Sequence, residues 1–282
     1  MSIEFIGSLV NASAHNSFAR SGGTDADYPA RITGGDDADQ LRDGDTSDKA
    51  ARYRRSDEFL DIVKLEWSSA TPFDYEGEFY RVRGALSSVR PAGGALPVYF
   101  AGASADAVLV GGKHADVYAF RGEPLAAIAA RITDVRAAAL PYGRSPRFSV
   151  SLRPIAAATE EAAWARARRI LEAEQRRGAP GAAFDHKGSL GSLRLAQFAD
   201  QAEIHDKRLW TPLAKTPTAG GNATALVGSY EQIAESLLDY VAIGVSTLLI
   251  RGYDPEGDAA DYARIIKLVR EQEPALAGVG PS

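Results

Sequence analysis

The feature that most constrains the fold is an alternation, from Pro97 onward, of short apolar segments with longer amphipathic segments. The short segments are almost continuously apolar at their centres, as is typical of strands that helices cover on both faces. They lie at 98–102, 116–120, 148–155 and 246–253, and a similar segment lies at 3–10. Such an alternation is typical of βα units that form a parallel sheet. The sequence therefore predicts an α/β fold.

Helix-capping residues mark the segments between these strands. Ser229 and Gln232 form an S-x-x-Q capping arrangement ahead of an apolar stripe, and this helix is expected to end at Gly244. Thr159 precedes two glutamates and is expected to cap a helix that continues to Gly178. Further helices are predicted at 56–67 and within 190–202, a β-hairpin near 72–84, and a variable excursion near 178–224.

This order of elements is compatible with two parallel architectures. Right-handed βα crossovers build either an open, doubly wound sheet or part of a closed (β/α)8 TIM barrel. No strand is followed by the G-x-G-x-x-G pattern of dinucleotide-binding sheets, and Gly111 lies within a predicted helix. The polar residues that follow the strands favour the barrel, because barrel enzymes place their chemistry there.

The composition excludes several kinds of site. The chain of 282 residues has no cysteine, which excludes disulfides, thiolate catalysis and cysteine-ligated metal sites. We expect no structural metal, because the histidines are too far apart in sequence for a helical metal motif; they are His15, His114, His186 and His205. The acidic run of Asp36, Asp37 and Asp39 lacks the spacing of a calcium-binding loop and is predicted to be a solvated loop.

Charge and hydropathy indicate a small-molecule ligand. The net charge of -5 argues against a nucleic acid or an anionic membrane as the partner, since both require a dense basic surface. No apolar run approaches the roughly 18 residues of a membrane span, and the N-terminus lacks the pattern of a signal peptide. We therefore expect a cytoplasmic protein that binds a small molecule.

Four blocks of sequence carry a resemblance to a known family. They are ARYRRSDEFLDIVKLEWSSATPFDYEGEFYRVRGA, PVYFAGASADAVLVGGKHADVYAFRGEP, RFSVSLRPIAAATEEAAWARARRIL and NATALVGSYEQIAESLLDYVAIGVSTLLIRGYDP. In this order they resemble the bacterial luciferase-like flavin-dependent monooxygenases, and within them the alkanesulfonate monooxygenase-like branch. The resemblance extends from Thr33 to Val269, apart from the excursion after Gly178.

The resemblance implies a fold and an activity. The fold would be a single luciferase-like (β/α)8 TIM barrel over 1–282, in a homodimer or homotetramer. The activity would be that of an oxidoreductase in a two-component system. A separate NAD(P)H:FMN reductase supplies reduced FMN, which reacts with O2, and a small organic molecule, such as an organosulfur compound, is oxygenated.

The resemblance also implies that the barrel is incomplete. In this family the Thr-Gly-Gly turn, here Thr33 to Gly35, follows the fourth barrel strand, and the segment 3–10 resembles the first strand. The residues directly before Thr33 are polar and include Pro29, so strands two to four are predicted to be missing between Ile32 and Thr33. Three explanations remain open: a segment lost from the recorded sequence, an internal deletion in the gene, or completion of the sheet by a partner.

The cofactor-binding residues are expected by resemblance at turns between strands and helices. There the serine of the turn Gly102, Ala103 and Ser104 contacts the FMN phosphate, and Tyr53 joins it. Thr33, Gly34 and Gly35 are expected to contribute in the same way. The alternative is that Ser104 only caps a helix and Tyr53 only packs.

The catalytic candidates follow the predicted strands: Arg121, Arg153, Arg251 and Tyr253. Arginine there can hold an anionic substrate or stabilise an anion formed during oxygen activation. The alternative for each arginine is a salt bridge to a loop carboxylate. Tyr253 is the first choice among the four, and His15 is expected to lie in a solvent-exposed loop.

Several residues depart from the alkanesulfonate pattern. Arg121 replaces a tryptophan, Ser151 and Arg153 replace an arginine and a histidine, and Pro255 replaces a histidine. The leading interpretation is thus an FMN-dependent monooxygenase of unassigned substrate. The alternatives are a truncated, non-catalytic remnant of the flavin barrel and an F420-dependent oxidoreductase of the same superfamily.

Overall fold

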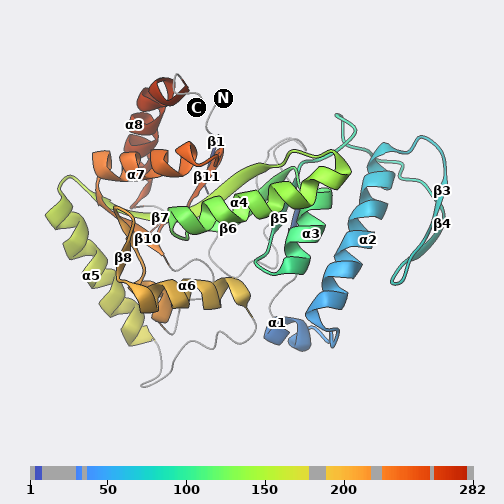
Figure 1. Ribbon diagram of the computed structural model, residues 1–282, viewed down its shortest axis with the longest axis horizontal. Helices are drawn as coiled ribbons and strands as arrows, with labels where there is room; N and C mark the ends of the chain where they lie inside the picture. The colour runs from blue at the N-terminus through green and yellow to red at the C-terminus, as the bar shows by residue number, and fades with distance from the viewer. Residues whose placement is uncertain are drawn as a thin grey trace. The chain divides into compact units, whose positions relative to one another are not determined.

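The chain forms two compact units, which are described separately. The computed structural model describes residues 4–7, 30–33, 37–177, 189–216, 224–254 and 257–277 (Figure 1). The first unit comprises Met1–Leu9, Ala119–Thr133 and Arg147–Ser282, and the second comprises Val10–Tyr118 and Asp134–Pro146. Strand β6 (Val117–Arg121) and helix α4 (Leu125–Ala139) each contribute residues to both units. The expectation of one domain over 1–282 stays a prediction.

The sheet of the first unit is organised by its longest strand, β7 (Arg147–Ala157). The first half of β7 pairs in parallel with β11 (Thr247–Ile250), and β11 pairs in parallel with β1 (Glu4–Gly7). The second half of β7 pairs in parallel with β10 (Ala225–Ser229). The short strands β9 (Leu209–Trp210) and β8 (Ile204–His205) continue from β10 in antiparallel order. This sheet is therefore mixed, although its βα units are parallel.

Several helices of the first unit lie where the sequence predicted them: α5 (Glu160–Arg177), α6 (Leu190–Gln201) and α7 (Tyr230–Ala242). Helix α8 (Ala259–Ala277) and the 3-10 helix η4 (Pro212–Lys215) were not predicted. The predicted capping box is present, because Ser229 and Gln232 exchange both hydrogen bonds. Gly244, with a φ of 106°, follows α7 as predicted. The core between α5, α6 and the sheet includes Ile155, Leu195 and Trp210.

The second unit combines a parallel strand pair with helices and a hairpin. Strand β2 (Ala30–Thr33) pairs in parallel with β5 (Val98–Ala101). The helices are α1 (Asp37–Arg42), α2 (Lys49–Ser68) and α3 (Ala105–His114), with a 3-10 helix η3 at Leu140–Tyr142. Tyr53, Phe100 and Tyr118 form a chain of tilted aromatic contacts in the core, with centroids 6.3 and 5.9 Å apart.

Strand β2 corrects the expectation that no strand precedes Thr33. Ala30 to Thr33 pair with Val98 to Ala101, directly ahead of the Thr-Gly-Gly turn, where the resemblance places the fourth barrel strand. A strand therefore does precede the Thr-Gly-Gly turn, contrary to that expectation. The sequence missed this strand because a strand in such a position depends on its pairing with β5, which is distant in sequence, rather than on its own composition. Residues 8–29 lie outside the described residues.

Two helix starts also differ from the sequence-based expectation. Asp37 begins helix α1 rather than lying in a solvated loop, and acidic residues are favourable at the positive N-terminal end of a helix. Helix α2 begins at Lys49 rather than Ser56, because the Asp48 carboxylate accepts the N–H of Ala51 at 2.7 Å and caps it. Residues 49–55 carry many charges and show no apolar stripe, so the sequence did not predict this first part of α2. Among the described residues, no helix is both long and apolar enough to cross a membrane.

The predicted hairpin is present and is anchored to α2 by one carboxylate. Strands β3 (Phe73–Glu76) and β4 (Arg81–Ala85) pair antiparallel, and Figure 1 shows them beside α2. The Glu58 carboxylate on α2 accepts the backbone N–H groups of Glu78, Phe79 and Tyr80 at 2.6, 2.9 and 3.1 Å. These bonds satisfy donors of the turn that the strand pairing leaves free.

We predict that Glu58→Gln loosens this hairpin. An amide presents one oxygen and adds two donors that face the three backbone donors, so roughly 1–3 kcal/mol of anchoring is lost. The measurement is amide hydrogen exchange, which is expected to accelerate at Glu78, Phe79 and Tyr80. Glu66→Gln on the same helix is the matched control, and unchanged protection of the three amides in the Glu58 variant would contradict the anchoring role.

Candidate functional site

Two of the predicted catalytic arginines lie at strand ends in the first unit, and the third, Arg153, lies within β7. Arg121 is the last residue of β6, and Arg251 directly follows β11. The register pairs Leu152 of β7 with Ile250 of β11, and the N–H of Arg251 donates to the Leu152 carbonyl at 3.1 Å. Arg153 therefore lies on β7 where β11 ends.

The end of β6 is also held close to β7. A Cβ added at Gly122 would lie 2.7 Å from Cδ2 of Leu152, which explains why glycine follows Arg121. The Thr224 hydroxyl donates to the Gly122 carbonyl at 2.6 Å and fixes this turn. The end of β6 at Arg121 thus lies against the part of β7 that carries Arg153, while the site roles of the arginines stay predictions.

Tyr253 lies against Arg153. The guanidinium carbon of Arg153 is 5.1 Å from the centroid of the Tyr253 ring. The ring is half-buried on the core of the first unit, but the hydroxyl oxygen is fully buried and has no hydrogen-bond partner in the described part of the chain. Burial raises the pKa of Tyr253 to about 12, and the positive charge of Arg153 opposes this shift. Tyr253 is therefore a protonated donor at neutral pH.

Arg121 contacts the first turn of α6. Its Nη1 donates to the hydroxyl of Ser192 at 2.8 Å, while Ser189 caps the same helix. Burial lowers the pKa of Arg121, and the nearby Glu123 carboxylate opposes this shift. The charges of Arg131 and Arg251 lower this pKa further, so Arg121 and Arg251 are close enough to interact electrostatically.

Glu123, the carboxylate nearest in sequence to Arg121, forms its hydrogen bonds with two other arginines. Glu123 is 0% exposed and accepts Nη1 of Arg131 at 3.0 Å. It also accepts Nε and Nη2 of Arg194 on α6 at 3.0 and 2.6 Å, a bidentate arrangement. Sequence analysis missed Glu123, Ser192 and Arg194. The sequence signal for Glu123 was the Glu123-Pro124 dipeptide shortly after β6.

The second unit contains the turn expected to bind a phosphate. Gly102, Ala103 and Ser104 connect β5 to α3, and the Ser104 hydroxyl caps α3 by accepting the N–H of Ala107 at 3.2 Å. A Cβ on Gly102 would lie 2.8 Å from the Tyr53 hydroxyl oxygen, so Tyr53 does reach this turn and glycine is required there. Tyr53 is only 3% exposed.

These residues fit a phosphate group. Capping uses an acceptor lone pair of the Ser104 hydroxyl, and its O–H is still able to donate to a phosphate oxygen. The first N–H groups of α3 and its positive N-terminal end favour an anion at the same place. Helix capping by Ser104, the alternative reading, is therefore observed and is compatible with binding.

The remaining candidates are only partly described. Thr33 ends β2 and pairs with Ala101, so the ends of β2 and β5 are adjacent. Gly34, Gly35, His15 and Pro255 lie outside the described residues.

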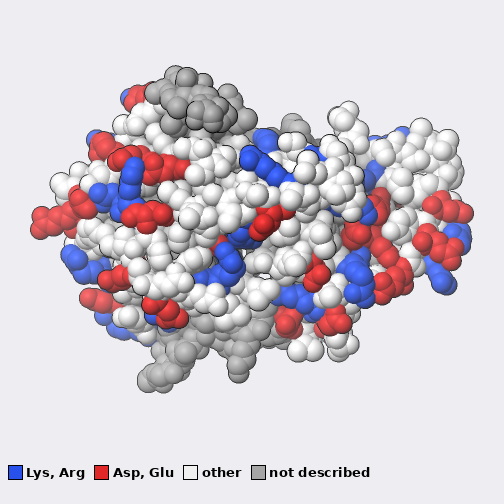
Figure 2. Space-filling view, viewed as in Figure 1, with Lys and Arg blue, Asp and Glu red and all other residues white. Residues whose placement is uncertain are grey.

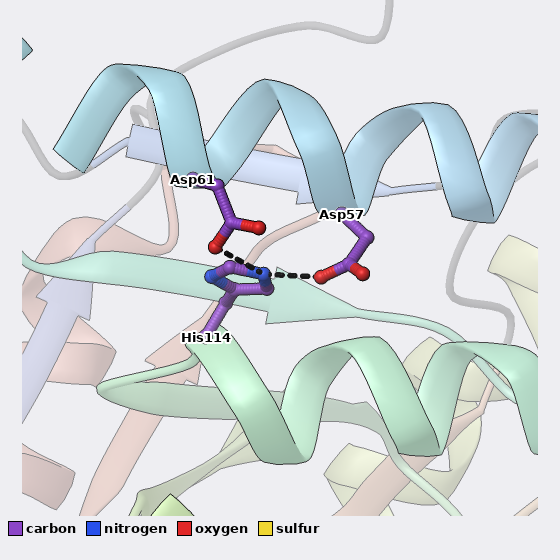
Figure 3. Close-up of side chains that lie close together, drawn as sticks. All are labelled: Asp57, Asp61 and His114. Atoms are coloured by element: carbon purple, nitrogen blue, oxygen red, sulfur yellow. Dashed lines mark hydrogen bonds and ion pairs between the residues drawn. The ribbon is translucent and has the colours of Figure 1, made fainter. Parts of the chain in front are cut away.

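A further cluster of possible metal ligands joins α2 to α3 (Figure 3). Nε2 of His114 lies 2.6 Å from Oδ1 of Asp57 and 3.8 Å from Oδ1 of Asp61. His114 is 1% exposed, and burial lowers its pKa, with Asp57 opposing the shift. Nζ of Lys113 lies 2.8 Å from an oxygen of each aspartate. Because this ammonium already pairs with both carboxylates, we interpret the cluster as an ion-pair network that fixes α2 against α3.

The distribution of charge over the visible surface is mixed. In Figure 2 acidic and basic side chains alternate over the face shown, without a continuous basic area.

Comparison with known structures supports the fold. A riboflavin lyase solved with modified FMN and riboflavin matches with a TM-score of 0.67 and 18% identity, over 86% of this chain and 62% of that chain. EDTA monooxygenase from Chelativorans sp. BNC1 matches with a TM-score of 0.62 and 18% identity, over 88% and 65%. An F420-dependent secondary alcohol dehydrogenase, solved with an F420–acetone adduct, matches with a TM-score of 0.60 and 13% identity, over 86% and 69%.

These comparisons define what the fold accommodates. The chain spans less than two thirds of the riboflavin lyase and of the EDTA monooxygenase. Neighbours with FMN and with F420 share the fold, so the fold alone does not select the cofactor. The predicted fold class, an α/β fold of the luciferase-like barrel type in incomplete form, is confirmed. The model of the luciferase-like monooxygenases matches residues 32–247, and the chain therefore belongs to this family of flavin-dependent monooxygenases and oxidoreductases.

Proposed function

We propose that the protein is the oxygenating component of a two-component, FMNH2-dependent monooxygenase that acts on a small organic molecule. The observation that carries this proposal is the turn from Gly102 to Ser104 at the N-terminus of α3, with the Tyr53 hydroxyl against it. Bound reduced FMN would supply the two electrons that activate O2. One oxygen atom enters the substrate and the other leaves as water, so the flavin is oxidised once in each turnover.

Residues of each unit are assigned a role in this proposal. In the second unit, the Ser104 hydroxyl, the first N–H groups of α3 and the Tyr53 phenol hold the phosphate of the cofactor. In the first unit, Arg121, Arg153 and Arg251 orient the substrate and stabilise negative charge, and the protonated Tyr253 donates a hydrogen bond. A separate NAD(P)H:FMN reductase and a homodimeric or homotetrameric assembly belong to the same proposal.

Two other functions remain under consideration, each on its own observation. Similarity to an F420-dependent alcohol dehydrogenase favours hydride transfer without oxygen chemistry. The family resemblance, in which barrel strands are missing between Ile32 and Thr33, favours a non-catalytic remnant with an internal deletion. An intact mass above the 30.0 kDa of this sequence would argue against the deletion, whereas a matching mass would support it.

We predict that Ser104→Asp selectively weakens FMN binding. Aspartate caps a helix as well as serine does, but its negative charge repels the phosphate, so α3 is preserved while FMN affinity falls at least about tenfold. Flavin fluorescence titration with FMN and with riboflavin, which has no phosphate, measures the effect. Riboflavin affinity is expected to stay within about twofold of the unmodified protein.

The matched control for this variant is Ser229→Asp, which replaces the cap of α7 in the first unit in the same way. Equal FMN affinity in the Ser104 and Ser229 variants would refute the phosphate site at α3.

We predict oxygen uptake when the protein is supplied with FMN, NADH, a flavin reductase and a substrate that it accepts. Uptake above that of the reductase alone, with oxygen appearing in the product from 18O2, is the expected result. Oxidation of reduced F420 without oxygen uptake would instead identify the deazaflavin alternative. Failure to bind either cofactor in titrations would identify the remnant.

A further inference from the structure

We propose that Tyr118 is a positioning residue of the second unit: its hydroxyl orients the turn between β5 and α3 and so directs the N–H of Ala103 to the bound phosphate. This inference rests on the proposed function, because it concerns the turn that is proposed to bind the phosphate of FMN. Ser104 and Tyr53 would contact the phosphate with their side chains, whereas Tyr118 acts through the backbone of the turn.

Tyr118 reaches the turn from the neighbouring strand of the sheet. It lies on β6, which is next to β5, and it is 0% exposed. Its hydroxyl donates to the Gly102 carbonyl at 3.0 Å. The ring packs beside Phe100 of β5, with the two ring centroids 5.9 Å apart. Because this packing fixes the hydroxyl, the hydroxyl in turn holds the carbonyl that accepts from it in one orientation.

The orientation of this carbonyl also sets that of the next N–H group. The Gly102 carbonyl and the Ala103 N–H belong to one planar trans peptide group, in which they point in opposite directions. Since the carbonyl points to the buried Tyr118 hydroxyl, the Ala103 N–H points away from it. Ala103 and Ser104 are half-buried and Ala105 is exposed, so the turn is partly open to solvent. The Ala103 N–H thus joins the first N–H groups of α3 as a donor for an anion.

Helix α3 leaves space for the ring of Tyr118. Gly111 lies inside this helix, where glycine is less favourable than alanine. A Cβ on Gly111 would lie 2.3 Å from Cε2 of Tyr118 and 2.9 Å from Cδ1 of Phe100. The glycine therefore allows the ring to pack against the helix. A phenylalanine ring would fit the same space, so the contribution specific to tyrosine is the hydrogen bond to the turn.

A matched hydrogen bond in the first unit separates positioning from stability. The hydroxyl of Tyr240, which is 2% exposed, donates to the Glu123 carbonyl at 2.9 Å. Each of the two bonds joins a buried tyrosine hydroxyl to a backbone carbonyl, so removing either one is expected to destabilise the protein similarly. Only the loss of the Tyr118 bond is expected to change the preference of the protein for a phosphorylated flavin.

The first experiment titrates FMN and riboflavin into the full-length protein, Tyr118→Phe and Tyr240→Phe, and follows flavin fluorescence. In Tyr118→Phe the affinity for FMN is expected to fall roughly three- to tenfold, the effect of one misplaced donor. The affinity for riboflavin, which has no phosphate, is expected to stay within about twofold. In Tyr240→Phe the ratio of the two affinities is expected to equal that of the unmodified protein.

The second experiment measures amide hydrogen exchange at Ala103. In the unmodified protein FMN is expected to slow this exchange, and riboflavin is expected to leave it nearly unchanged. In Tyr118→Phe the protection by saturating FMN is expected to be smaller, because the peptide group no longer keeps one orientation. Tyr240→Phe is expected to behave like the unmodified protein.

The outcomes distinguish the positioning role from the proposed function. A full preference for FMN in Tyr118→Phe, or an equal loss of that preference in Tyr240→Phe, would overturn the positioning role and leave the proposed function standing. Full protection of the Ala103 amide by FMN in Tyr118→Phe would do the same. An unmodified protein that binds FMN no better than riboflavin, or binds neither, would overturn the phosphate site and the role of Tyr118 together.

Discussion

The arrangement of the first unit depends on the double pairing of strand β7. Its first half pairs with β11 and its second half with β10, both in parallel. The register that places Ile250 beside Leu152 also places Arg251 and Tyr253 next to Arg153. A shift of one residue would turn alternate side chains to the other face of the sheet, so this register decides whether the polar residues meet. The core residues Ile155 and Val227 stabilise it, because they pair across β7 and β10 and pack with Trp210.

The charged groups of the two units are paired in different ways. In the second unit, Lys113 and His114 contact Asp57 and Asp61 and so join two helices. Glu123 plays a similar part in the first unit by binding Arg131 and Arg194. Arg121 and Arg153 stand apart from these networks, since neither forms an ion pair with a described carboxylate. Buried side-chain donors without a partner are uncommon in folded proteins, and Nε of Arg153 is one of them among the described residues.

Sequence patterns predicted those helices and strands whose determining residues lie close together in the chain. The capping box at Ser229, the helix after Thr159, the hairpin around Gly77 and the strands of the βα units follow from residues within a few positions of one another. The sequence did not predict helix α1, which a salt bridge from Arg52 to Asp37 stabilises. It also did not predict the first part of α2, which the buried Tyr53 stabilises, or strand β2, which depends on pairing with β5. Strand β10 was also missed, since its place beside β7 depends on a partner about 70 residues earlier in the chain.

The sequence by itself determined the α/β class, most of the helices, the family resemblance and the choice of Arg121, Arg153, Arg251 and Tyr253, because apolar periodicity, caps and residues after strands are local features. Only the tertiary structure decided that Ala30 to Thr33 form a strand and that Tyr53 reaches Gly102. It also decided that Glu123 is bound by Arg131 and Arg194, while Arg153 lies over the ring of Tyr253. The physical reason is that the balance of charges and hydrogen bonds at a site depends on which distant side chains the fold brings within reach.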